Sequence, residues 1–522
     1  MFTAIQKNVL CAGIALAMAG SAFAGNANMS RVMVKMQPGS RGNVEATVRA
    51  AGGQVHHRFD DLNVMAISVP TQALQGLSHN PNVEYIEEDV VRYPLALFND
   101  EASTGNPYAA GQTVPYGIKM VQADQLPSGD FYTSNRKVCI IDSGYDGNHE
   151  DLPRGTHITG EYDSGTGWWY TDENHHGTHV AGTIAALNNS GTGVVGVNSN
   201  NALKLHIVKV FDASGWAYSS SLVAATEKCR QAGANIISMS LGGSLKSKTE
   251  DTQFSKLLNT YGILSIAAAG NDGNNRMSYP ASYTTVVSVA ALDADKNWAT
   301  FSQYNSQVEI AAPGVSVLST VPMNQGSRSV LTVGSVSYKP GDMSGSAKTT
   351  VTAPLADFGI GDKINTAVAG KVCLIARGTV DFNTKVSNCK NSGGVGAVVY
   401  NNVAGGFSGT LGDGVTSTIP AVTASDTEGA QLKTQLGQSA TVGVQAWSYA
   451  YYDGTSMATP HVSAVAALVW SYFPNCTATQ IRNTLNKSAE DLGPAGRDTK
   501  FGFGLVRAKA AYDRIKSLGC NN

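Results

Sequence analysis

Apolar and polar positions recur along the chain with periods that predict both strands and helices. Residues 138–141 are continuously apolar and residues 263–269 almost so, which is typical of strands buried on both faces of a parallel sheet. Residues 462–470 are apolar on every side, and residues 184–187 are a second run of small helix-forming residues, so both predict buried helix. The pattern therefore predicts an α/β fold, a parallel sheet with helices on both faces.

A different pattern precedes this part of the chain. Strand-like runs and helical stretches follow one another in the order β-α-β-α-β, which predicts a small α+β domain. The strand-like runs are residues 31–35, 64–69 and 83–86, and the helical stretches are residues 43–51 and 71–77.

Length and charge add two constraints. The 522 residues exceed what one hydrophobic core usually supports, so two or three domains are expected. The net charge is only −2, which argues against a nucleic-acid partner or an anionic membrane surface.

The first residues are typical of a secretory signal peptide. Lys7 supplies the positive charge, residues 9–19 the apolar core, and Ala22-Phe23-Ala24 an A-x-A cleavage signal. The apolar core is too short to span a membrane. We therefore expect a secreted, extracellular protein.

One serine is a candidate nucleophile. Ser456 lies at the amino end of the predicted helix 462–470, and Pro460 falls in its first turn, where a proline costs little. A serine there is most often a helix cap, but the free backbone N–H groups also suit an oxyanion. A serine nucleophile needs a base and an orienting carboxylate. His176 and Asp142, which directly follows the first predicted strand, supply both.

The order Asp, His, Ser and the surrounding residues resemble the subtilisin-like serine proteases (subtilases, peptidase family S8). The resemblance rests on nine ordered segments: residues 112–117 (QTVPYG), 142–144 (DSG), 174–183 (NHHGTHVAGT), 238–243 (SMSLGG), 267–271 (AAAGN), 279–280 (YP), 312–314 (APG), 454–461 (GTSMATPH) and 501–504 (FGFG). It implies a subtilisin-like parallel sheet and a serine-type endopeptidase.

The resemblance also implies a role for each site residue. Asp142 would orient His176, which would take the proton of Ser456 as Ser456 attacks the scissile carbonyl and forms an acyl-enzyme. The Asn271 side chain and the Ser456 N–H would hold the oxyanion. Backbone groups would pair with an extended peptide, and small residues would leave room for a bulky apolar side chain. The backbone groups are those of Ser240, Leu241, Gly242 and residues 214–217, and the small residues are Ala268 and Gly270.

The sequence contains candidate ligands for two kinds of metal site. His175 and His179 have the i, i+4 spacing of two ligands on one helix face, but the glutamate of the H-E-x-x-H signature is missing. Calcium fits better, because hard cations take oxygen ligands from loops. The resemblance implies a structural calcium site, with an ordinary Asn/Gly turn as the alternative. Its ligands would be the side chains of Gln112, Asp151 and Asn189 and the carbonyls of Leu187, Thr192 and Val194.

Loss of Cys11 with the signal peptide would leave six of the seven cysteines. An even number in a secreted protein predicts disulfides, and six cysteines allow fifteen pairings. The pairing that keeps partners within predicted domains is Cys373–Cys389 and Cys476–Cys520, which leaves Cys139–Cys229.

Two further regions resemble known modules. The region ending at residues 84–89 (EYIEED) resembles the inhibitor-type propeptides of subtilisins, with a permanent N-terminal domain as the alternative. Residues 370–402 resemble part of the mostly β protease-associated (PA) domain, inserted in a surface loop, for which a passive role is the alternative. The expected division is signal peptide 1–24, propeptide 25–97, linker and maturation region 98–110, catalytic domain 111–321, inserted PA domain 322–447 and catalytic domain 448–522.

These features together imply a secreted endopeptidase made as a self-inhibited zymogen. Its partners would be protein or peptide substrates and its own propeptide as intramolecular inhibitor, and we expect a monomer with no organic cofactor. Two alternatives keep the fold and change the function: a catalytically silent peptide-binding protein, and a transferase or ligase that uses the same acyl-enzyme. The intact set Asp142, His176, Ser456 and Asn271 argues against the first. No sequence feature favours the second.

Overall fold

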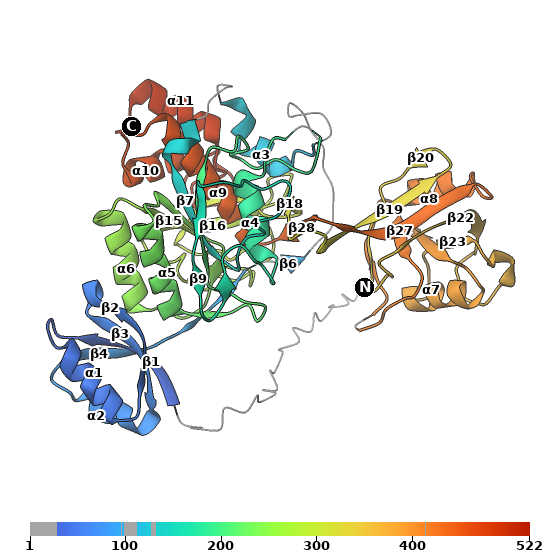
Figure 1. Ribbon diagram of the computed structural model, residues 1–522. Helices are drawn as coiled ribbons and strands as arrows, with labels where there is room; N and C mark the ends of the chain where they lie inside the picture. The colour runs from blue at the N-terminus through green and yellow to red at the C-terminus, as the bar shows by residue number, and fades with distance from the viewer. Residues whose placement is uncertain are drawn as a thin grey trace, which may run out of the picture. The chain divides into compact units, whose positions relative to one another are not determined.

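The structure is a computed structural model that describes residues 29–95, 97–98, 112–126, 132–189, 191–412 and 414–521. The predicted signal peptide, with Cys11, and residues 99–110 of the predicted linker lie outside the described residues. The chain divides into two compact units, with the boundary in the sequence between Ile86 and Glu87. Figure 1 labels the helices and strands in chain order.

The first unit contains a four-stranded sheet in the order β2-β3-β1-β4 and two helices. The elements are β1 (Met29–Met36), α1 (Arg41–Ala50), β2 (Gln54–Phe59), β3 (Val64–Pro70), α2 (Leu74–Ser78) and β4 (Val83–Glu88). All but β2 were predicted from the sequence. The residues of β2 alternate between half-buried and exposed positions and are mostly polar, so the strand has only a weak apolar signal.

The second unit is built on a seven-stranded sheet in the order β17-β16-β15-β13-β7-β11-β8, with parallel pairing between neighbours. Its strands are β7 (Lys137–Asp142), β8 (Ile158–Gly160), β11 (Lys204–Lys209), β13 (Ile236–Met239), β15 (Leu264–Ala268), β16 (Val286–Leu292) and β17 (Val308–Pro313). The accompanying helices include α4 (His176–Ala185), α5 (Ser219–Gln231), α6 (Lys248–Asn259), α9 (Thr455–Tyr472), α10 (Ala478–Ser488) and α11 (Ala508–Leu518).

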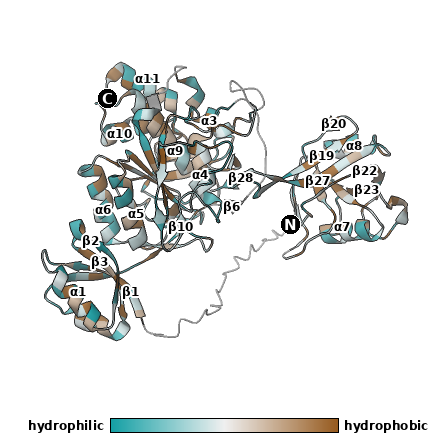
Figure 2. Ribbon diagram, in the orientation of Figure 1, coloured by the Kyte–Doolittle hydropathy of each residue, from teal (hydrophilic) through white to brown (hydrophobic). Residues whose placement is uncertain are grey.

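Hydrophobic cores on both faces of this sheet explain the continuously apolar pattern of β7. Val138 and Ile140 belong to a core that includes residues of α4 and α9. Cys139 and Ile141 belong to a second core that includes residues of α5 and α6. Successive side chains of a strand point to opposite faces, so both faces of β7 are buried. The predicted α/β class with helices on both faces is confirmed. In Figure 2, helices such as α1 and α11 carry hydrophobic and hydrophilic residues together, as expected where only one face is packed.

Helix α9 corrects one detail of the sequence prediction. It begins at Thr455, after Gly454, so Pro460 lies in its interior and not in its first turn. A proline there has no N–H to donate to the carbonyl four residues earlier, which is that of Ser456. The Ser240 hydroxyl donates to this carbonyl at 2.7 Å instead. The helix therefore keeps this carbonyl satisfied.

The long insertion before α9 contains a second seven-stranded sheet, in the order β20-β19-β27-β22-β23-β24-β26, with hydrophobic clusters of its own. Strands outnumber helices in it, and residues 370–402 contain two of its strands and one of its helices. The elements are β19 (Gly326–Val333), β20 (Val336–Ser337), β22 (Thr350–Asp357), β23 (Val372–Ala376), α7 (Phe382–Asn391), β24 (Gly396–Tyr400), β26 (Ala421–Ala424), α8 (Asp426–Lys433) and β27 (Ser439–Trp447).

Paired strands carry the chain into and out of this insertion. β18 (Val317–Thr320) is antiparallel to β28 (Tyr449–Asp453), and β19 is antiparallel to β27, beginning with Gly326 opposite Trp447. The segments by which the chain enters and leaves the insertion therefore lie beside each other.

The predicted disulfides are present: Cys139–Cys229, Cys373–Cys389 and Cys476–Cys520. The first ties β7 to α5, and the second ties β23 to α7. Among the described residues, no helix has the length and apolar character needed to cross a membrane.

Candidate active site

Asp142 and His176 come together at the carboxyl end of the central strand β7. Asp142 is the last residue of β7 and is fully buried, and His176 is the first residue of α4. The Asp142 Oδ1 atom lies 2.7 Å from His176 Nδ1 and also accepts the Ser143 N–H at 2.7 Å. This contact fixes the ring so that Nε2 is free to act as a base.

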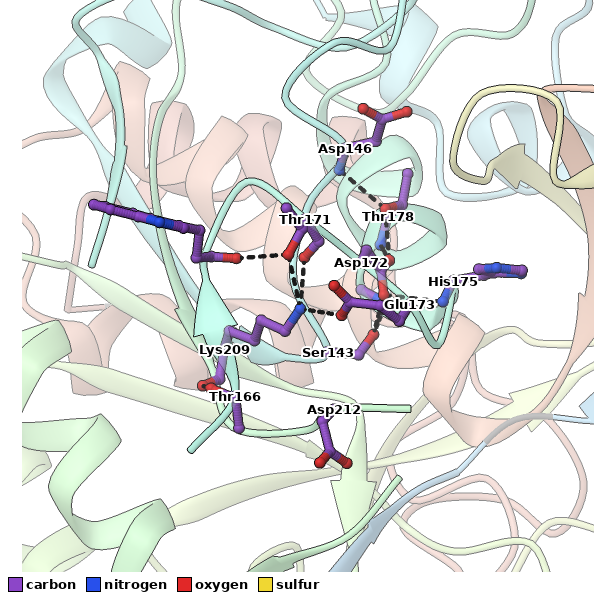
Figure 3. A network of polar contacts seen from close by, with 12 residues as sticks. Ser143, Asp146, Thr166, Thr171, Asp172, Glu173, His175, Thr178, Lys209 and Asp212 are labelled. Carbon is purple, nitrogen blue, oxygen red and sulfur yellow. Dashed lines mark hydrogen bonds and ion pairs between the residues drawn. The ribbon is translucent and has the colours of Figure 1, made fainter. Parts of the chain in front are cut away.

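Asp172, which the sequence reading missed, holds both neighbouring segments in place (Figure 3). Its Oδ1 accepts the Ser143 hydroxyl at 2.7 Å and the His175 N–H at 2.9 Å, and its Oδ2 accepts the Thr178 N–H at 2.8 Å. Ser143 Oγ in turn accepts the Gly177 N–H at 2.8 Å. One carboxylate therefore joins the loop after β7 to the first turn of α4. An aspartate just before a helix is a capping signal that could have indicated this residue.

A buried lysine supports the loop that carries Asp172. Lys209, at the end of β11, has a fully buried side chain and donates to the Thr171 carbonyl at 3.0 Å. Its ammonium also pairs with Glu173 and contacts the Thr171 hydroxyl. In Figure 3 the side chains of Lys209, Thr171 and Glu173 converge. The loop before α4 is therefore held both by the contacts of Asp172 and by those of Lys209.

Ser456 lies in the first turn of α9 and is fully buried. Its hydroxyl donates to the Ser240 carbonyl at 2.8 Å, and His176 Nε2 has no hydrogen-bond partner among the described residues. The structure therefore brings Asp142 and His176 into contact, whereas the Ser456 hydroxyl is turned to another acceptor.

A segment of the chain itself occupies the predicted peptide-binding groups. Strand β5 (Val91–Pro94) runs between β12 (Ala217–Tyr218) and β14 (Leu241–Gly242), antiparallel to both. The next residue, Leu95, donates its N–H to Ser456 Oγ at 3.0 Å and to the Ser240 carbonyl at 3.2 Å. The predicted substrate-binding residues Ser240, Leu241 and Gly242 thus pair with residues 91–95 as with an added strand.

The Leu95 carbonyl oxygen accepts the two donors that were predicted for the oxyanion. Asn271 Nδ2 donates to it at 2.9 Å and the Ser456 N–H at 3.2 Å. The other end of the Asn271 amide is fixed, because its Oδ1 accepts the Thr455 N–H at 2.9 Å and the Thr455 hydroxyl at 2.8 Å. These are distances at which backbone and amide donors stabilise a developing negative charge.

Leu95 is one of the residues that line a cavity of about 480 Å³. A Cβ at Gly242 would lie 3.0 Å from Leu95 Cδ1 and 2.6 Å from Ser278 Oγ, so the absence of a side chain there makes room. The other predicted small residues, Ala268 and Gly270, are buried and do not line this cavity. A Cβ at Gly270 would instead meet Gln303. The cavity lining also includes Gly243, Ser244, Asp272, Arg276, Met277 and Gln303.

Two acidic residues before β5 contact helix N-termini. The Glu87 carboxylate accepts the N–H groups of Lys248 at 2.8 Å and Thr249 at 3.0 Å, at the start of α6. The Asp89 carboxylate accepts the Ser220 N–H at 2.8 Å, at the start of α5. Helix N-termini carry free donors and a partial positive charge, so both contacts are favourable.

The predicted calcium ligands also converge. Gln112 Nε2 lies 2.7 Å from the Leu187 carbonyl and 2.8 Å from the Thr192 carbonyl, and 3.2 Å from both Asn189 Oδ1 and the Val194 carbonyl. An amide nitrogen has only two hydrogens for these four oxygens.

Two more oxygens of the same set lack a partner among the described residues. Gln112 Oε1 and Asp151 Oδ1 are buried there without a hydrogen bond, while Asp151 Oδ2 accepts the Val194 N–H at 2.7 Å. Burial raises the pKa of the Asp151 carboxyl to about 8. Four oxygens thus face one amide group, and two more oxygens of the same residues lack partners; carbonyl, amide and carboxylate oxygens are the donors that Ca²⁺ prefers. The residues present therefore fit a calcium ion.

His175 and His179 differ in their surroundings. His175 has a left-handed backbone (φ 74°) just before α4 begins, whereas the buried His179 Nε2 lies 2.9 Å from the Val317 carbonyl. Burial lowers the pKa of His179 to about 3, and the nearby His176 contributes to the shift. Among the described residues, no cluster of three or more His, Cys, Asp or Glu side chains could hold a metal ion.

Comparison with known proteins identifies two matching family models. The model of the Subtilase family matches residues 133–352 and 318–504, and the model of the Fervidolysin N-terminal prodomain matches residues 30–89. Among characterised relatives, subtilisin amylosacchariticus of Bacillus subtilis subsp. amylosacchariticus is 37% identical over 278 residues, 52% of this chain and 67% of the relative. Alkaline elastase YaB of Bacillus sp. (strain YaB) is 30% identical over 458 residues, 87% of this chain and 81% of the relative.

Two solved structures have a similar fold. The psychrophilic subtilisin-like protease Apa1 from the Antarctic psychrotroph Pseudoalteromonas sp. AS-11 is 43% identical, with a TM-score of 0.62 over 78% of this chain and 99% of that one. Fervidolysin from Fervidobacterium pennivorans, described as a keratinolytic enzyme related to subtilisin, is 23% identical, with a TM-score of 0.58 over 95% of this chain and 62% of that one. The second likeness concerns the fold alone.

Proposed function

The chain belongs to the subtilase family, and from that premise we propose that this serine-type endopeptidase is made as a self-inhibited zymogen and acts through Asp142, His176 and Ser456. Its N-terminal prodomain is the part that matches the fervidolysin prodomain. The observation that carries the proposal is the Leu95 carbonyl oxygen, which accepts hydrogen bonds from both Asn271 Nδ2 and the Ser456 N–H.

In the proposed reaction, His176 Nε2 takes the proton of the Ser456 hydroxyl as Ser456 Oγ attacks the scissile carbonyl. The hydroxyl must first turn from the Ser240 carbonyl toward His176. Asp142, bonded to Nδ1, keeps the ring in the tautomer that can accept this proton and stabilises the imidazolium. The tetrahedral oxyanion then takes the place of the Leu95 oxygen, between Asn271 and the backbone N–H. His176 returns the proton to the leaving amine, and water hydrolyses the acyl-enzyme.

We further propose that the first substrate is the peptide bond after Leu95. Residues 91–95 already lie in the groove as an added strand, and the contacts of Glu87 and Asp89 with α6 and α5 hold the preceding residues. Cleavage there would release the prodomain, and continued binding of the released segment would inhibit the enzyme. An inhibitor tethered to the site is favoured by its high effective concentration.

A structural calcium ion is part of the proposal. Gln112, Asp151 and Asn189 would bind it through side-chain oxygens and Leu187, Thr192 and Val194 through carbonyls, and the bound ion would neutralise the buried Asp151 carboxylate. The support is the convergence of these oxygens and the two without partners.

The proposed setting is extracellular. Three disulfides, typical of oxidising compartments, support it, as does the predicted signal peptide. Protein substrates follow from the endopeptidase activity, and we propose a monomer. We propose that residues 322–447 are a PA domain, which the parallel arrangement of β22, β23, β24 and β26 with α7 supports.

The test compares the full-length protein with Ser456→Ala and with Ser463→Ala. Ser463 is a buried serine of the same helix whose hydroxyl donates to Ser238 at 2.8 Å, so it is a matched control outside the site. The wild type and Ser463→Ala should lose the segment that ends at Leu95, as mapped by mass spectrometry, and then digest casein. Ser456→Ala should do neither. Casein digestion by Ser456→Ala would refute the nucleophile. A folded wild type without activity would favour a peptide-binding protein.

A further inference from the structure

Arg92 and Glu250 form an ion pair that is removed from solvent. Arg92 Nη2 lies 2.8 Å from Glu250 Oε2, and the two side chains are 1% and 0% exposed. Arg92 lies in β5, three residues before Leu95, whereas Glu250 lies in the first turn of α6. A buried carboxylate is stable only with a well-placed partner, so the fit between the two side chains is specific.

The pocket around the guanidinium is built from residues that follow Leu95 in the chain. Arg92 Nη2 also donates to the Leu245 carbonyl at 3.0 Å. The Tyr283 hydroxyl lies 2.9 Å from Glu250 Oε2, the same oxygen that the guanidinium contacts, and it accepts the Ser247 N–H at 2.9 Å. Within the described residues, Glu250 has no other ion pair, and its Oε1 has no hydrogen-bond partner. If the chain is cut after Leu95 and residues 87–95 leave, the carboxylate loses the cation with which it pairs.

The strand register links this pocket to the reaction. In β5, Arg92 is opposite Ala217 of β12 and Tyr93 is opposite Gly242 of β14, and Leu95 is at the oxyanion donors. A substrate that pairs with β12 and β14 in the same way would place its fourth residue before the scissile bond where Arg92 now lies. Side chains of a bound strand alternate, so this residue would point into the same pocket.

We propose that Glu250, with Tyr283 and the Leu245 carbonyl, forms a binding pocket for a guanidinium, so that the enzyme selects proteins with arginine at the fourth position before the cleaved bond. The inference rests on the proposed function, because it takes Leu95 as the residue before the scissile bond. Arginine is favoured over lysine, because its planar fork can reach the carboxylate and the Leu245 carbonyl together.

The direct test uses the mature wild-type enzyme and quenched fluorescent octapeptides with the sequence of residues 92–99 (RYPLALFN). The fourth-position arginine is replaced by lysine, citrulline or alanine. Citrulline keeps the shape of arginine and loses the charge. We expect kcat/KM to fall roughly 30-fold or more for citrulline and alanine, since each leaves Glu250 buried and unpaired, and to fall less for lysine. Values for arginine and citrulline within about threefold of each other would overturn the pocket.

Two variants locate the effect. Glu250→Gln should reduce the preference for arginine over citrulline to less than about threefold, and it should cleave the alanine peptide faster than the wild type does, because no unpaired carboxylate is then buried. Asp251→Asn, the matched control, removes a charge from the adjacent, partly exposed residue, which pairs with Lys246 at 2.8 Å, and should keep the full preference. Loss of the preference in both variants would overturn the pocket, because a general negative potential would then be its cause.

The outcomes separate this inference from the function on which it rests. If Glu250→Gln does not mature, the citrulline comparison on wild-type enzyme still decides the proposal. Casein digestion without discrimination at the fourth position would overturn the pocket and leave the protease intact. Cleavage of neither casein nor any peptide would overturn the proposed function, and the pocket with it.

Discussion

At the residue scale, the two ends of the Asn271 side-chain amide make different contacts. One end of its amide accepts two hydrogen bonds from Thr455, which lies directly before Ser456, and the other end donates to the Leu95 carbonyl. The donor is therefore fixed before any charge develops. A preorganised donor of this kind stabilises the transition state more than the ground state, because the charge on the oxygen grows during the reaction.

Asn271→Leu should therefore lower kcat by about 10²–10³ and leave KM nearly unchanged. Thr455→Val, which removes one of the two bonds to Asn271 Oδ1, is the comparison and should have a much smaller effect on kcat. Steady-state kinetics on one peptide substrate measures both. A loss of kcat below about fivefold in Asn271→Leu would contradict the assigned role.

At the scale of elements, the residues before β5 act through helix ends. Glu87 and Asp89 each present a carboxylate to the free N–H groups of α6 and α5. Such contacts are worth about 0.5–2 kcal/mol each, and in the proposed zymogen they lie on the segment whose binding in the groove would inhibit the enzyme.

Glu87→Gln and Asp89→Asn should each let this segment open more often. In the full-length Ser456→Ala protein, we expect the amides of residues 91–95 to exchange hydrogen about 2–30 times faster, which is the contact energy expressed as a population. Hydrogen exchange read by mass spectrometry measures the change. Glu84→Gln changes an exposed glutamate of β4 and should leave the exchange as it is. Equal exchange in all variants would show that neither carboxylate contributes to holding the segment.

Helix α4 also contains a group that couples its packing to pH. His179 contacts the Val317 carbonyl at 2.9 Å, and its ring stacks on Tyr452 with centroids 4.3 Å apart. Its folded pKa of about 3 lies below its ordinary value of about 6.5, so the unfolded chain binds the extra proton. Stability should therefore fall as the pH drops from about 6.5 toward 3.

The expected slope is up to about 1.4 kcal/mol per pH unit for this one histidine. The free energy of unfolding of the Ser456→Ala protein, measured with guanidinium between pH 7 and pH 5, should show this slope. The substitution His179→Gln should lower the slope by the contribution of about one proton. An unchanged slope in His179→Gln would mean that His179 is not the group that takes up the proton.

The sequence predicted those elements whose signals are local. Strand β7 was found because both of its faces are buried, and helix α9 because it is apolar all around. Strand β5 was not found, because its partners β12 and β14 lie more than a hundred residues later and its pattern alone is too short. Separation in the sequence also hid the pairing of Arg92 with Glu250, which are 158 residues apart. The proposed catalytic triad, Asp142, His176 and Ser456, was visible only through motifs, whereas the bond of Ser456 to the Ser240 carbonyl depends on tertiary packing.

At the scale of the whole molecule, calcium would join the start of the catalytic region to the loop after α4. Gln112 and the loop residues from Leu187 to Val194 are far apart in the sequence, and ion binding to the folded state alone stabilises it. In the Ser456→Ala protein, a chelator should lower the melting temperature, and added Ca²⁺ should restore it. Asp151→Asn should lose most of this response, and Glu150→Gln, a change at the adjacent exposed residue, should keep it. An equal response in all three would place the ion elsewhere.

The insertion is attached in a way that makes its removal a clean experiment. Strand β19 begins at Gly326 and β27 ends at Trp447, and these two residues are paired; the ribbon of β18 and β28 continues on the other side of that pair. Its sheet has hydrophobic clusters of its own, so the catalytic sheet does not depend on it for burial.

Replacement of residues 328–445 by a two-residue Asn-Gly turn should close β19 and β27 as a short hairpin. We expect the shortened enzyme to mature and to cleave the octapeptide within about threefold of the wild-type kcat/KM, because no described residue of the triad, oxyanion donors or guanidinium pocket lies in the insertion. The rates at which the shortened enzyme and the wild type digest casein then show what the insertion contributes. A loss on casein alone would assign it to the binding or admission of folded substrates, and equal rates would make it a passive addition. A loss on the octapeptide would show that the insertion supports the active site itself.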